Sequence, residues 1–237
     1  MFACIIVDIL VWCKYMPEDF SVFPSAIVTV DVVLFAIAEG HLQVLLPKRG
    51  SVPFFGARAL PGGYLRVQSD VDAFDSARRV LATKANLISG YALEQLAVFS
   101  GIARDPRGWS LSVAFYAVAR AESVAFDDFV DVDALPSLPF DHGEVVRAAI
   151  ARMRGGSGLS ALPAFMLPGE FTIRDFQEVY ESVMGRAVDS SSLRRRIEDA
   201  EMLVPVEGKF RDAPHGRPAQ LYRLSDAVVR RYAGGVL

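Results

Sequence analysis

The 237-residue sequence contains only two cysteines, Cys4 and Cys13, and neither belongs to a CxxC or other metal-ligand pattern. They imply no disulfide framework, which fits a protein of the reducing cytoplasm. The sequence is also poor in histidine, with three scattered residues, His41, His142 and His215. Their spacing predicts neither a zinc site nor a catalytic triad, and we expect all three at the surface.

The sequence also lacks a strong net charge and an apolar run long enough to span a bilayer. A formal net charge of −3 argues against indiscriminate coating of nucleic acid, but it does not exclude one basic face. The apolar start is interrupted by Asp8 and has neither a basic segment before it nor a small-residue cleavage site after it. We interpret residues 1–22 as an N-terminal extension, either a buried extra strand or a misassigned start with Met16 as initiator. No membrane partner is expected.

With 52% hydrophobic and 22% charged residues, the sequence has enough apolar side chains to form a buried core. Its length fits two domains. The segment GGSGLSALP, residues 155–163, has the small and helix-breaking residues of a linker. It separates a first domain, residues 23–154, from a second domain, residues 164–237.

The first domain alternates strand and helix patterns. β-Branched and apolar runs predict strands over residues 26–38, 41–49, 93–99 and 110–119. Helices are predicted over residues 70–87 and 141–154. A glycine loop, residues 56–63, precedes the first helix, whose apolar residues at helical spacing are Val71, Phe74, Ala77, Leu81 and Ala85. The expected fold is α/β with a mixed sheet.

The second domain changes to short helices. Thr172 and Asp175 have the spacing of a capping box, and Gly185 is placed to end that helix. Asp189 and three serines can cap a second helix, whose inward residues would be Leu193, Ile197 and Ala200. Two strand candidates follow, residues 203–208 and 218–224. Two helices joined by a short turn and followed by a β-hairpin describe a winged helix-turn-helix domain.

Basic residues of the second domain gather where such a domain meets DNA. Three arginines follow the serines at the start of the second helix, and more basic residues lie in the loop between the two strands. A solvated helix face is the alternative explanation. Because the first turns of that helix meet phosphates and base edges, we predict DNA contact. The predicted contact residues are Ser191, Ser192, Arg194, Arg195, Arg196, Lys209, Arg211, His215 and Arg217.

The stretch PGGYLRVQSDVDAFDSARRVLATKANL, residues 61–87, is similar to the Nudix hydrolase box, G-x5-E-x7-R-E-U-x-E-E-x-G-U, in which U is aliphatic. The glutamates of that box hold divalent metal on a pyrophosphate. With Arg79 aligned to the arginine of the box, Val80, Thr83 and Lys84 stand where the glutamates belong, and the front half is two residues too long. The sequence therefore predicts no hydrolysis, no metal and no cofactor.

Several longer segments resemble one family: VTVDVVLFAI, LQVLLPKR, ALPGGYL, LEQLAVFSGIARDPRGWSLSVAFYAV, FTIRDFQEVYESVMGR and GRPAQLYRLS. They look like the Nudix-related transcriptional regulators of bacterial NAD metabolism (NrtR type), from about Phe23 onward. The resemblance implies an α/β Nudix-like mixed-sheet sandwich followed by a winged helix. It also implies a homodimeric DNA-binding repressor of NAD-related or sugar metabolism, which senses ADP-ribose or a related nucleotide and then releases DNA.

The resemblance further implies a set of effector contacts. Carried over to this sequence, they are Arg49, Pro61, Gly62, Gly63, Arg79, Glu94, Gln95, Arg104, Asp105 and Arg107. Glu94 would accept hydrogen bonds from ribose hydroxyls or an adenine amine, and Arg107 would meet phosphate. A buried capping acid and a loop salt bridge are the alternatives for these two residues. The glycine loop itself is consistent with a phosphate site neutralised by Lys48, Arg49, Arg58, Arg78 and Arg79, or with a simple tight turn.

Two other functions remain compatible with the sequence. One is a nucleoside-diphosphate-sugar pyrophosphatase that uses acids outside the box, namely Asp70, Asp72, Asp75 or Glu94. The other is an interaction module whose second domain binds protein instead of DNA. The salt dependence of binding distinguishes a second domain that binds DNA from one that binds protein. Each contact with a DNA phosphate contributes about −0.9 to the slope of log affinity against log salt.

Overall fold

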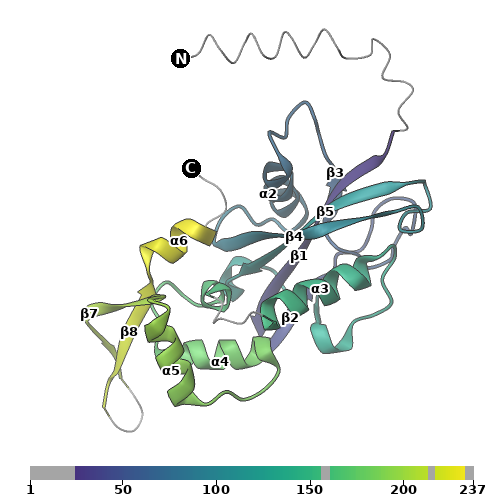
Figure 1. The fold of residues 1–237 in the computed structure, drawn as a ribbon. Coiled ribbons are helices and arrows are strands. Elements are labelled where there is room, and N and C mark those ends of the chain that lie inside the picture. Colours follow the sequence, from purple (N-terminus) through teal and green to yellow (C-terminus); the bar gives the residue numbers. More distant parts are fainter. Residues whose placement is uncertain (1–24, 156–160, 213–216, 233–237) are drawn as a thin grey trace, which may run out of the picture.

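The computed structural model of the protein describes residues 25–155, 161–212 and 217–232 (Figure 1). The N-terminal extension expected at residues 1–22, and with it the choice between Met1 and Met16, lies outside these ranges. So do His215 and most of the expected linker. No helix within the described ranges is both long and apolar enough to cross a membrane.

The first part of the chain is built on a mixed sheet, as expected. Its strands are β1 (Ile27–Ala38), β2 (His41–Leu45), β3 (Gly62–Tyr64), β4 (Tyr91–Gly101), β5 (Ser110–Ala119) and β6 (Phe129–Asp131). They are arranged in the order β4-β5-β1-β2-β6, with β3 also paired to β1. Strands β1 and β5 are parallel and the other pairs are antiparallel.

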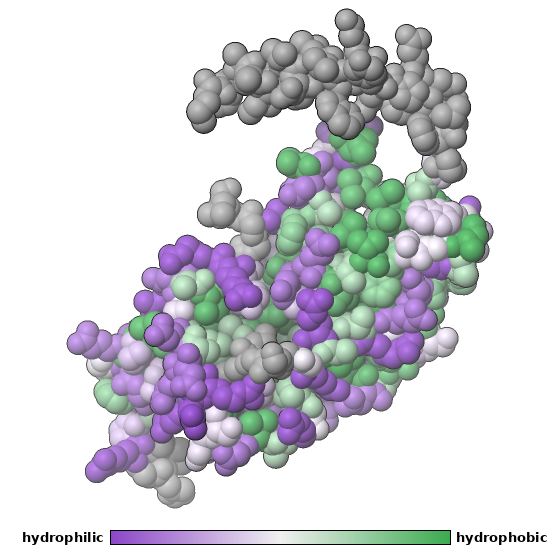
Figure 2. Space-filling view, viewed as in Figure 1, coloured by the Kyte–Doolittle hydropathy of each residue, from purple (hydrophilic) through white to green (hydrophobic). Residues whose placement is uncertain are grey.

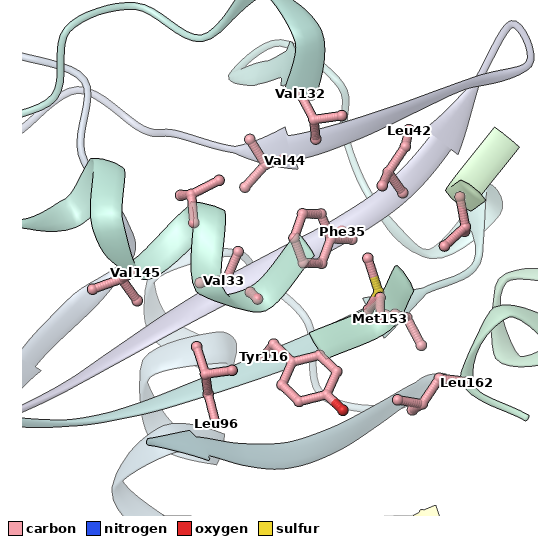
Figure 3. Close-up of a cluster of buried hydrophobic side chains, with 14 of the residues drawn as sticks. Val33, Phe35, Leu42, Val44, Leu96, Tyr116, Val132, Val145, Met153 and Leu162 are labelled. Carbon is pink, nitrogen blue, oxygen red and sulfur yellow. The ribbon is translucent and has the colours of Figure 1, made fainter. Parts of the chain in front are cut away.

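One helix covers each face of this sheet, α2 (Ala73–Lys84) on one side and α3 (His142–Arg154) on the other. Successive side chains of β1 point to opposite faces. Val32 packs in one core with Leu81 of α2, and Phe35 packs in the other with Met153 of α3 (Figure 3). Burial of each large side chain stabilises the fold by about 1.5–3 kcal/mol. The uninterrupted apolar run of β1 therefore reflects a strand buried on both faces.

Helix α2 is shorter than the predicted span of residues 70–87. It begins after Asp72, whose side chain accepts a hydrogen bond from the Asp75 amide at 2.7 Å. Val71 was expected on the apolar face, but it lies outside the helix and is 91% exposed. Asn86 has a left-handed backbone with φ 52°, which ends the helix soon after Lys84. Asp72 as N-cap and Asn86 as terminator thus set limits that apolar spacing alone did not show.

The second part of the chain contains α4 (Ile173–Met184), α5 (Ser190–Asp199), β7 (Leu203–Arg211), β8 (Ala219–Leu224) and α6 (Asp226–Tyr232). The predicted capping box of α4 is confirmed, because Thr172 and Asp175 bond each other's backbone amides. Gly185 ends α4 with φ 66°. Leu193 and Ile197 of α5 are buried as expected, but Ala200 is exposed because it is the C-cap residue beyond the last turn.

Three short elements escaped the sequence prediction: β3, β6 and α6. A further difference concerns the end of the expected linker, because Ala161, Leu162 and Pro163 are buried and a 3-10 helix spans Leu162–Met166. Leu162 belongs to the same apolar cluster as the sheet and α3 (Figure 3). Val183 of α4 is in this cluster too, so chain segments on both sides of the linker share one core.

Helix α3 contacts both parts of the molecule. At its start, Asp141 and His142 lie among polar side chains of the first part, and the Asp141 carboxylate is bonded by Arg104. At its end, the Arg154 Nε donates to the carbonyl oxygen of Val183 in α4 at 2.7 Å. The 13 residues of α3 span about 20 Å at 1.5 Å per residue. One rigid element therefore reaches from the sheet edge to the helix-turn-helix.

Candidate functional site

A cavity of about 360 Å³ opens between α2, the loop after β2, the β3 loop and the start of α3. Eight of the ten predicted effector contacts line it: Arg49, Pro61, Gly62, Gly63, Arg79, Arg104, Asp105 and Arg107. The wall also contains residues outside that prediction, among them Asp31, Lys48, Tyr64, Arg66, Val80, Thr83, Lys84, Phe140 and His142. Tertiary structure thus assembles one basic, concave site from six separate segments.

Glu94 and Gln95, the other two predicted contacts, do not line this cavity. The Glu94 Oε2 accepts a hydrogen bond from the hydroxyl of Tyr116, whose ring packs in the α3 core. Burial and this bond raise the pKa of Tyr116 above its usual value. Gln95 is exposed on β4. The role of a structural acid fits the surroundings of Glu94 better than a ribose contact in this cavity.

The floor of the cavity is Asp31, a residue that the sequence analysis did not single out. The residue is 6% exposed, and its Oδ2 accepts a hydrogen bond from the Ser112 hydroxyl at 2.6 Å. The Arg104 guanidinium lies 3.5 Å from the same oxygen. A lone acid within the apolar run VTVDVVLF was the available signal, because a buried charge needs partners.

His142 lies beside Asp31 and is buried, so the expectation of a surface position was wrong for this residue. Its Nδ1 accepts a hydrogen bond from the Leu60 amide at 3.0 Å, and its Nε2 lies 3.8 Å from the Asp31 Oδ1. Burial lowers the pKa of His142 below its ordinary value, which favours the neutral imidazole. A neutral ring can accept at Nδ1 and donate at Nε2, which matches both neighbours.

Three of the cavity arginines are held by carboxylates. Arg79 donates to both oxygens of Asp70 at 2.7 Å. Arg107 donates to both oxygens of Asp105 at 2.9 and 2.6 Å. These hydrogen bonds hold the pKa values of Asp70 and Asp105 below the usual range. Such bidentate pairs fix the guanidinium planes and leave little net charge for a ligand.

Arg104, the third, is the most enclosed of these arginines, with a side chain 8% exposed. Its Nε and Nη2 each lie 2.9 Å from an oxygen of Asp141, and its Nη1 donates to the Ser110 hydroxyl at 3.3 Å. Together with the Asp31 contact, these bonds engage all three nitrogens of the guanidinium. We infer that Arg104 joins α3 to the sheet and does not primarily contact a ligand.

Four cations of the cavity wall have no acidic partner among the residues that the structure describes: Lys48, Arg49, Arg66 and Lys84. The Arg49 Nε donates to the Pro53 carbonyl at 2.9 Å, and its guanidinium lies 4.9 Å from the ring centre of Phe140. Burial and the charge of Arg107 lower the pKa of Arg49. An anion with more than one negative charge would relieve this accumulation of positive charge.

The wall formed by α2 presents Val80, Thr83 and Lys84 to the cavity, the three residues that replace the glutamates of the aligned box. The Thr83 hydroxyl donates back to the Arg79 carbonyl at 2.7 Å. Within residues 25–155, 161–212 and 217–232, no cluster of three or more His, Cys, Asp or Glu side chains could hold a metal ion. This wall therefore offers an apolar group, a hydroxyl and an ammonium group.

The acids that an alternative hydrolase could use have other partners. Asp70 is bound by Arg79 and by the Arg66 amide at 2.8 Å. Asp72 caps α2, and the Asp75 Oδ2 accepts from the Val71 amide at 3.1 Å. None of Asp70, Asp72, Asp75 and Glu94 is on the cavity wall. The geometry thus brings no pair of them together at the cavity.

Two basic residues that were expected to neutralise a phosphate point elsewhere. Arg58 donates to the Leu46 carbonyl at 2.9 Å and to the Asp128 carboxylate at 3.2 Å. Arg78 has its guanidinium 6.0 Å from the ring centre of Phe74. Neither residue lines the cavity, because side chains of neighbouring positions leave the loop and helix in different directions.

Gly62 and Gly63 give a matched pair for testing the glycine loop. A Cβ atom on Gly62 would come 2.0 Å from the Asp31 Oδ1 and 2.9 Å from the Val30 carbonyl oxygen, whereas one on Gly63 would have no neighbour within 4 Å. We predict that Gly62→Ala lowers the free energy of unfolding by about 1–3 kcal/mol. Gly63→Ala should change it by less than about 0.5 kcal/mol. Urea denaturation measures both, and equal stabilities would contradict the close approach to Asp31.

A second polar surface lies on the winged helix. Ser191, Ser192, Arg194 and Arg195 are exposed on α5, and hydrophilic residues dominate the surface over α5, β7 and β8, at the lower left of Figure 2. A groove of about 470 Å³ runs between the starts of α4 and α5 and strand β8. Its lining includes Arg174, Gln177, Ser190, Ser191, Arg194 and Gln220. Four of the five predicted contact residues of α5 therefore face solvent, and two of them, Ser191 and Arg194, line the polar groove.

The basic residues of the β7–β8 hairpin make ion pairs with the helical part. Lys209 lies 2.7 Å from Glu170, and Arg211 lies 2.6 Å from Asp175. Arg196 is partly buried and Arg217 is exposed. These pairs hold the hairpin close to the start of α4.

Comparisons with known proteins match both parts of the chain. The sequence model of the NrtR DNA-binding winged helix domain matches residues 163–224. The chain is 33% identical over 225 residues to the ADPR responsive transcriptional repressor NtrR of Acinetobacter baylyi, which covers 90% of this chain and 86% of that protein. It is also 34% identical over 122 residues to the ADP-ribose pyrophosphatase of Methanocaldococcus jannaschii, covering 49% of this chain and 70% of that protein.

Solved structures agree with this division. Shewanella oneidensis NrtR complexed with a 27mer DNA superposes with a TM-score of 0.75 and 34% identity, covering 86% of this chain and 96% of that one. The Nudix domain of the same protein complexed with ADP ribose superposes with a TM-score of 0.52 and 30% identity, covering 61% of this chain and 97% of that one. The predicted Nudix-like sandwich followed by a winged helix is confirmed.

Proposed function

Because the chain belongs to the NrtR family of Nudix-related transcriptional regulators, we propose that it is a DNA-binding transcriptional repressor that senses ADP-ribose. The observation that carries this proposal is a cavity lined by uncompensated cations and without a metal-binding acid cluster in the described residues, in one chain with an exposed basic helix-turn-helix. Cations suit a diphosphate ligand, and the exposed arginines of α5 suit DNA.

We also propose that the Nudix-like domain does not hydrolyse its ligand. Val80, Thr83 and Lys84 provide no carboxylate for Mg²⁺, a cation that takes oxygen ligands. The similarity to the pyrophosphatase of Methanocaldococcus jannaschii favours the alternative of hydrolysis, but that activity needs a metal site that these side chains do not supply. In this proposal the fold of a hydrolase serves for recognition alone.

DNA is read by α5 in the major groove. Ser191, Ser192, Arg194 and Arg195 would contact base edges and phosphates from the first half of the helix, and Arg196 from its last turn. Arg211 and Arg217 of the hairpin would contact the backbone. We propose that two copies of the chain bind together, so that the operator is roughly palindromic with half-sites one or two helical turns apart.

Release of DNA requires that ADP-ribose prefers one arrangement of the two parts of the molecule. The cavity wall includes His142 at the start of α3, and Arg154 at its end bonds α4. Buried apolar residues on both sides of the linker also belong to one cluster. We propose that residues 23–154 sense the effector, that residues 164–237 bind DNA, and that a filled cavity changes their relative position.

The experiment that tests this function is a mobility-shift titration. The purified chain is titrated onto DNA from upstream of its own gene and the neighbouring genes, with and without ADP-ribose. We expect a specific complex that resists nonspecific competitor DNA and dissociates when ADP-ribose is added. A specific complex that ignores ADP-ribose would refute the proposed effector. The absence of any specific complex, together with Mg²⁺-dependent cleavage of ADP-ribose, would establish the hydrolase instead.

A further inference from the structure

We propose that Lys84 replaces the divalent cation of a Nudix site as the charge that binds the effector's diphosphate, so that the effector binds without metal. The inference rests on the proposed function and concerns the chemistry of the same cavity. In this inference, the ammonium group of one residue of α2 supplies the positive charge that a divalent cation supplies in a Nudix hydrolase.

The position of Lys84 carries the first step. It occupies the last turn of α2, next to Thr83 and one turn after Val80, and all three line the cavity. In the aligned box, the same turn carries the glutamates that hold the metal against the pyrophosphate. A cation attached to this turn therefore lies where the bound metal would otherwise place positive charge.

The second step is that the charge of Lys84 is available. The side chain is exposed, and no acid of the described residues lies within ion-pair distance of it. Arg79 and Arg107 on the same wall are each held by both oxygens of a carboxylate. Arg49 also has no acidic partner in the described part of the chain, but a carbonyl and the Phe140 ring fix its orientation. A flexible ammonium group with three donors can adjust to a diphosphate.

The third step excludes a shared site for lysine and metal. Mg²⁺ needs several oxygen ligands in near-octahedral geometry, and protein carboxylates normally supply some of them. Among the described residues, two acids line the cavity, and both already have partners: Asp31 is bonded by Ser112 and paired with Arg104, and Asp105 accepts from Arg107 with both oxygens. Asp70, just outside the wall, is bonded by Arg79. An ammonium group at this wall also repels a divalent cation. Metal and Lys84 are therefore mutually exclusive as counter-charges at this wall.

Isothermal titration calorimetry of the full chain with ADP-ribose tests the inference, in buffer with EDTA and in buffer with Mg²⁺. The wild type should give the same Kd in both buffers, within about twofold. Lys84→Gln, which removes the charge and leaves a polar side chain one atom shorter, should weaken binding by about tenfold or more in both buffers, the effect of losing one charge-assisted hydrogen bond. Arg147→Gln is the matched control, because Arg147 is exposed on α3, where its Nε donates to the Gly143 carbonyl one turn earlier, and it does not line the cavity.

Wild-type binding that is lost in EDTA and restored by Mg²⁺ would overturn the inference while leaving ADP-ribose sensing in place. Lys84→Gln binding equal to that of Arg147→Gln would overturn it as well. No binding of ADP-ribose in either buffer would overturn the proposed sensing, and the inference with it. A mobility shift with DNA confirms in every case that the variant is folded.

Discussion

Replacing Arg194 and Arg195 with alanine should lower the affinity of the chain for its specific DNA by about 100-fold or more. Both side chains are exposed in the middle of α5, and Arg194 lines the polar groove. A guanidinium that contacts a base edge contributes about 1–3 kcal/mol to the free energy of binding. The loss of two such contacts, each at the middle of that range, lowers the affinity by more than about 100-fold. The fold should be unaffected, because alanine favours helix and the ion pair that disappears, Arg195 with Asp199 at 3.8 Å, is an exposed one.

The measurement is a mobility-shift titration at several salt concentrations. If the two arginines bind phosphates, the slope of log affinity against log salt should become shallower by about 0.9 for each phosphate that is no longer neutralised. A control with the same change in charge is Arg147→Ala with Arg230→Ala, on α3 and α6. Equal affinity and slope for the two double variants would place the DNA interface elsewhere.

Replacing Arg104 with methionine should lower the free energy of unfolding by about 3–5 kcal/mol. Removal of one partner from a buried ion pair leaves the other charge uncompensated, and this costs far more than the net contribution of the pair. Here two carboxylates, Asp31 and Asp141, would lose the same guanidinium, and their side chains are 9% and 15% exposed. Methionine fills similar space, so the decrease in stability would reflect charge more than a void.

Urea denaturation provides the measurement, and Arg58→Met is the control. Arg58 forms the same type of pair with Asp128, but the two side chains are 31% and 42% exposed, so we expect a decrease of about 1 kcal/mol or less. The double variant Arg104→Met with Asp141→Asn keeps only one of the two uncompensated carboxylates. Its free energy of unfolding should therefore be higher than that of Arg104→Met alone. A decrease for Arg104→Met no larger than for Arg58→Met would show that Arg104 is free to contact the effector.

Local patterns determined much of the architecture. The apolar run of β1 predicted a strand, and the capping box at Thr172 with the glycine stop at Gly185 set both ends of α4. Asp189 predicted the start of α5 in the same way. These signals are readable because the interacting groups lie within four residues of each other or repeat with the period of the element. The small residues of the linker and the residues that stand at the glutamate positions on α2 were also visible in the local sequence.

Local patterns did not predict the short elements, and they did not predict every residue that lines the cavity. Strands β3 and β6 have three residues each, too few to show a period, and they exist because β1 and β2 offer free edges. Arg58 was expected near the ligand, but the Asp128 carboxylate, 70 residues away, draws it away from the cavity. Glu94 was assigned to the ligand by its motif, but the Tyr116 hydroxyl holds it outside the cavity.

The sequence by itself determined both ends of α4, the start of α5, the strand β1 and the absence of glutamates from the α2 wall. Only the tertiary structure decided that Asp31, Arg104 and His142 form one buried cluster at the base of the cavity. These residues lie in three segments with ordinary local patterns, and no local pattern records their proximity. Their pairing follows from the parallel contact of β1 with β5 and from the packing of α3, and a buried charge is tolerated only where such long-range contacts supply its partners.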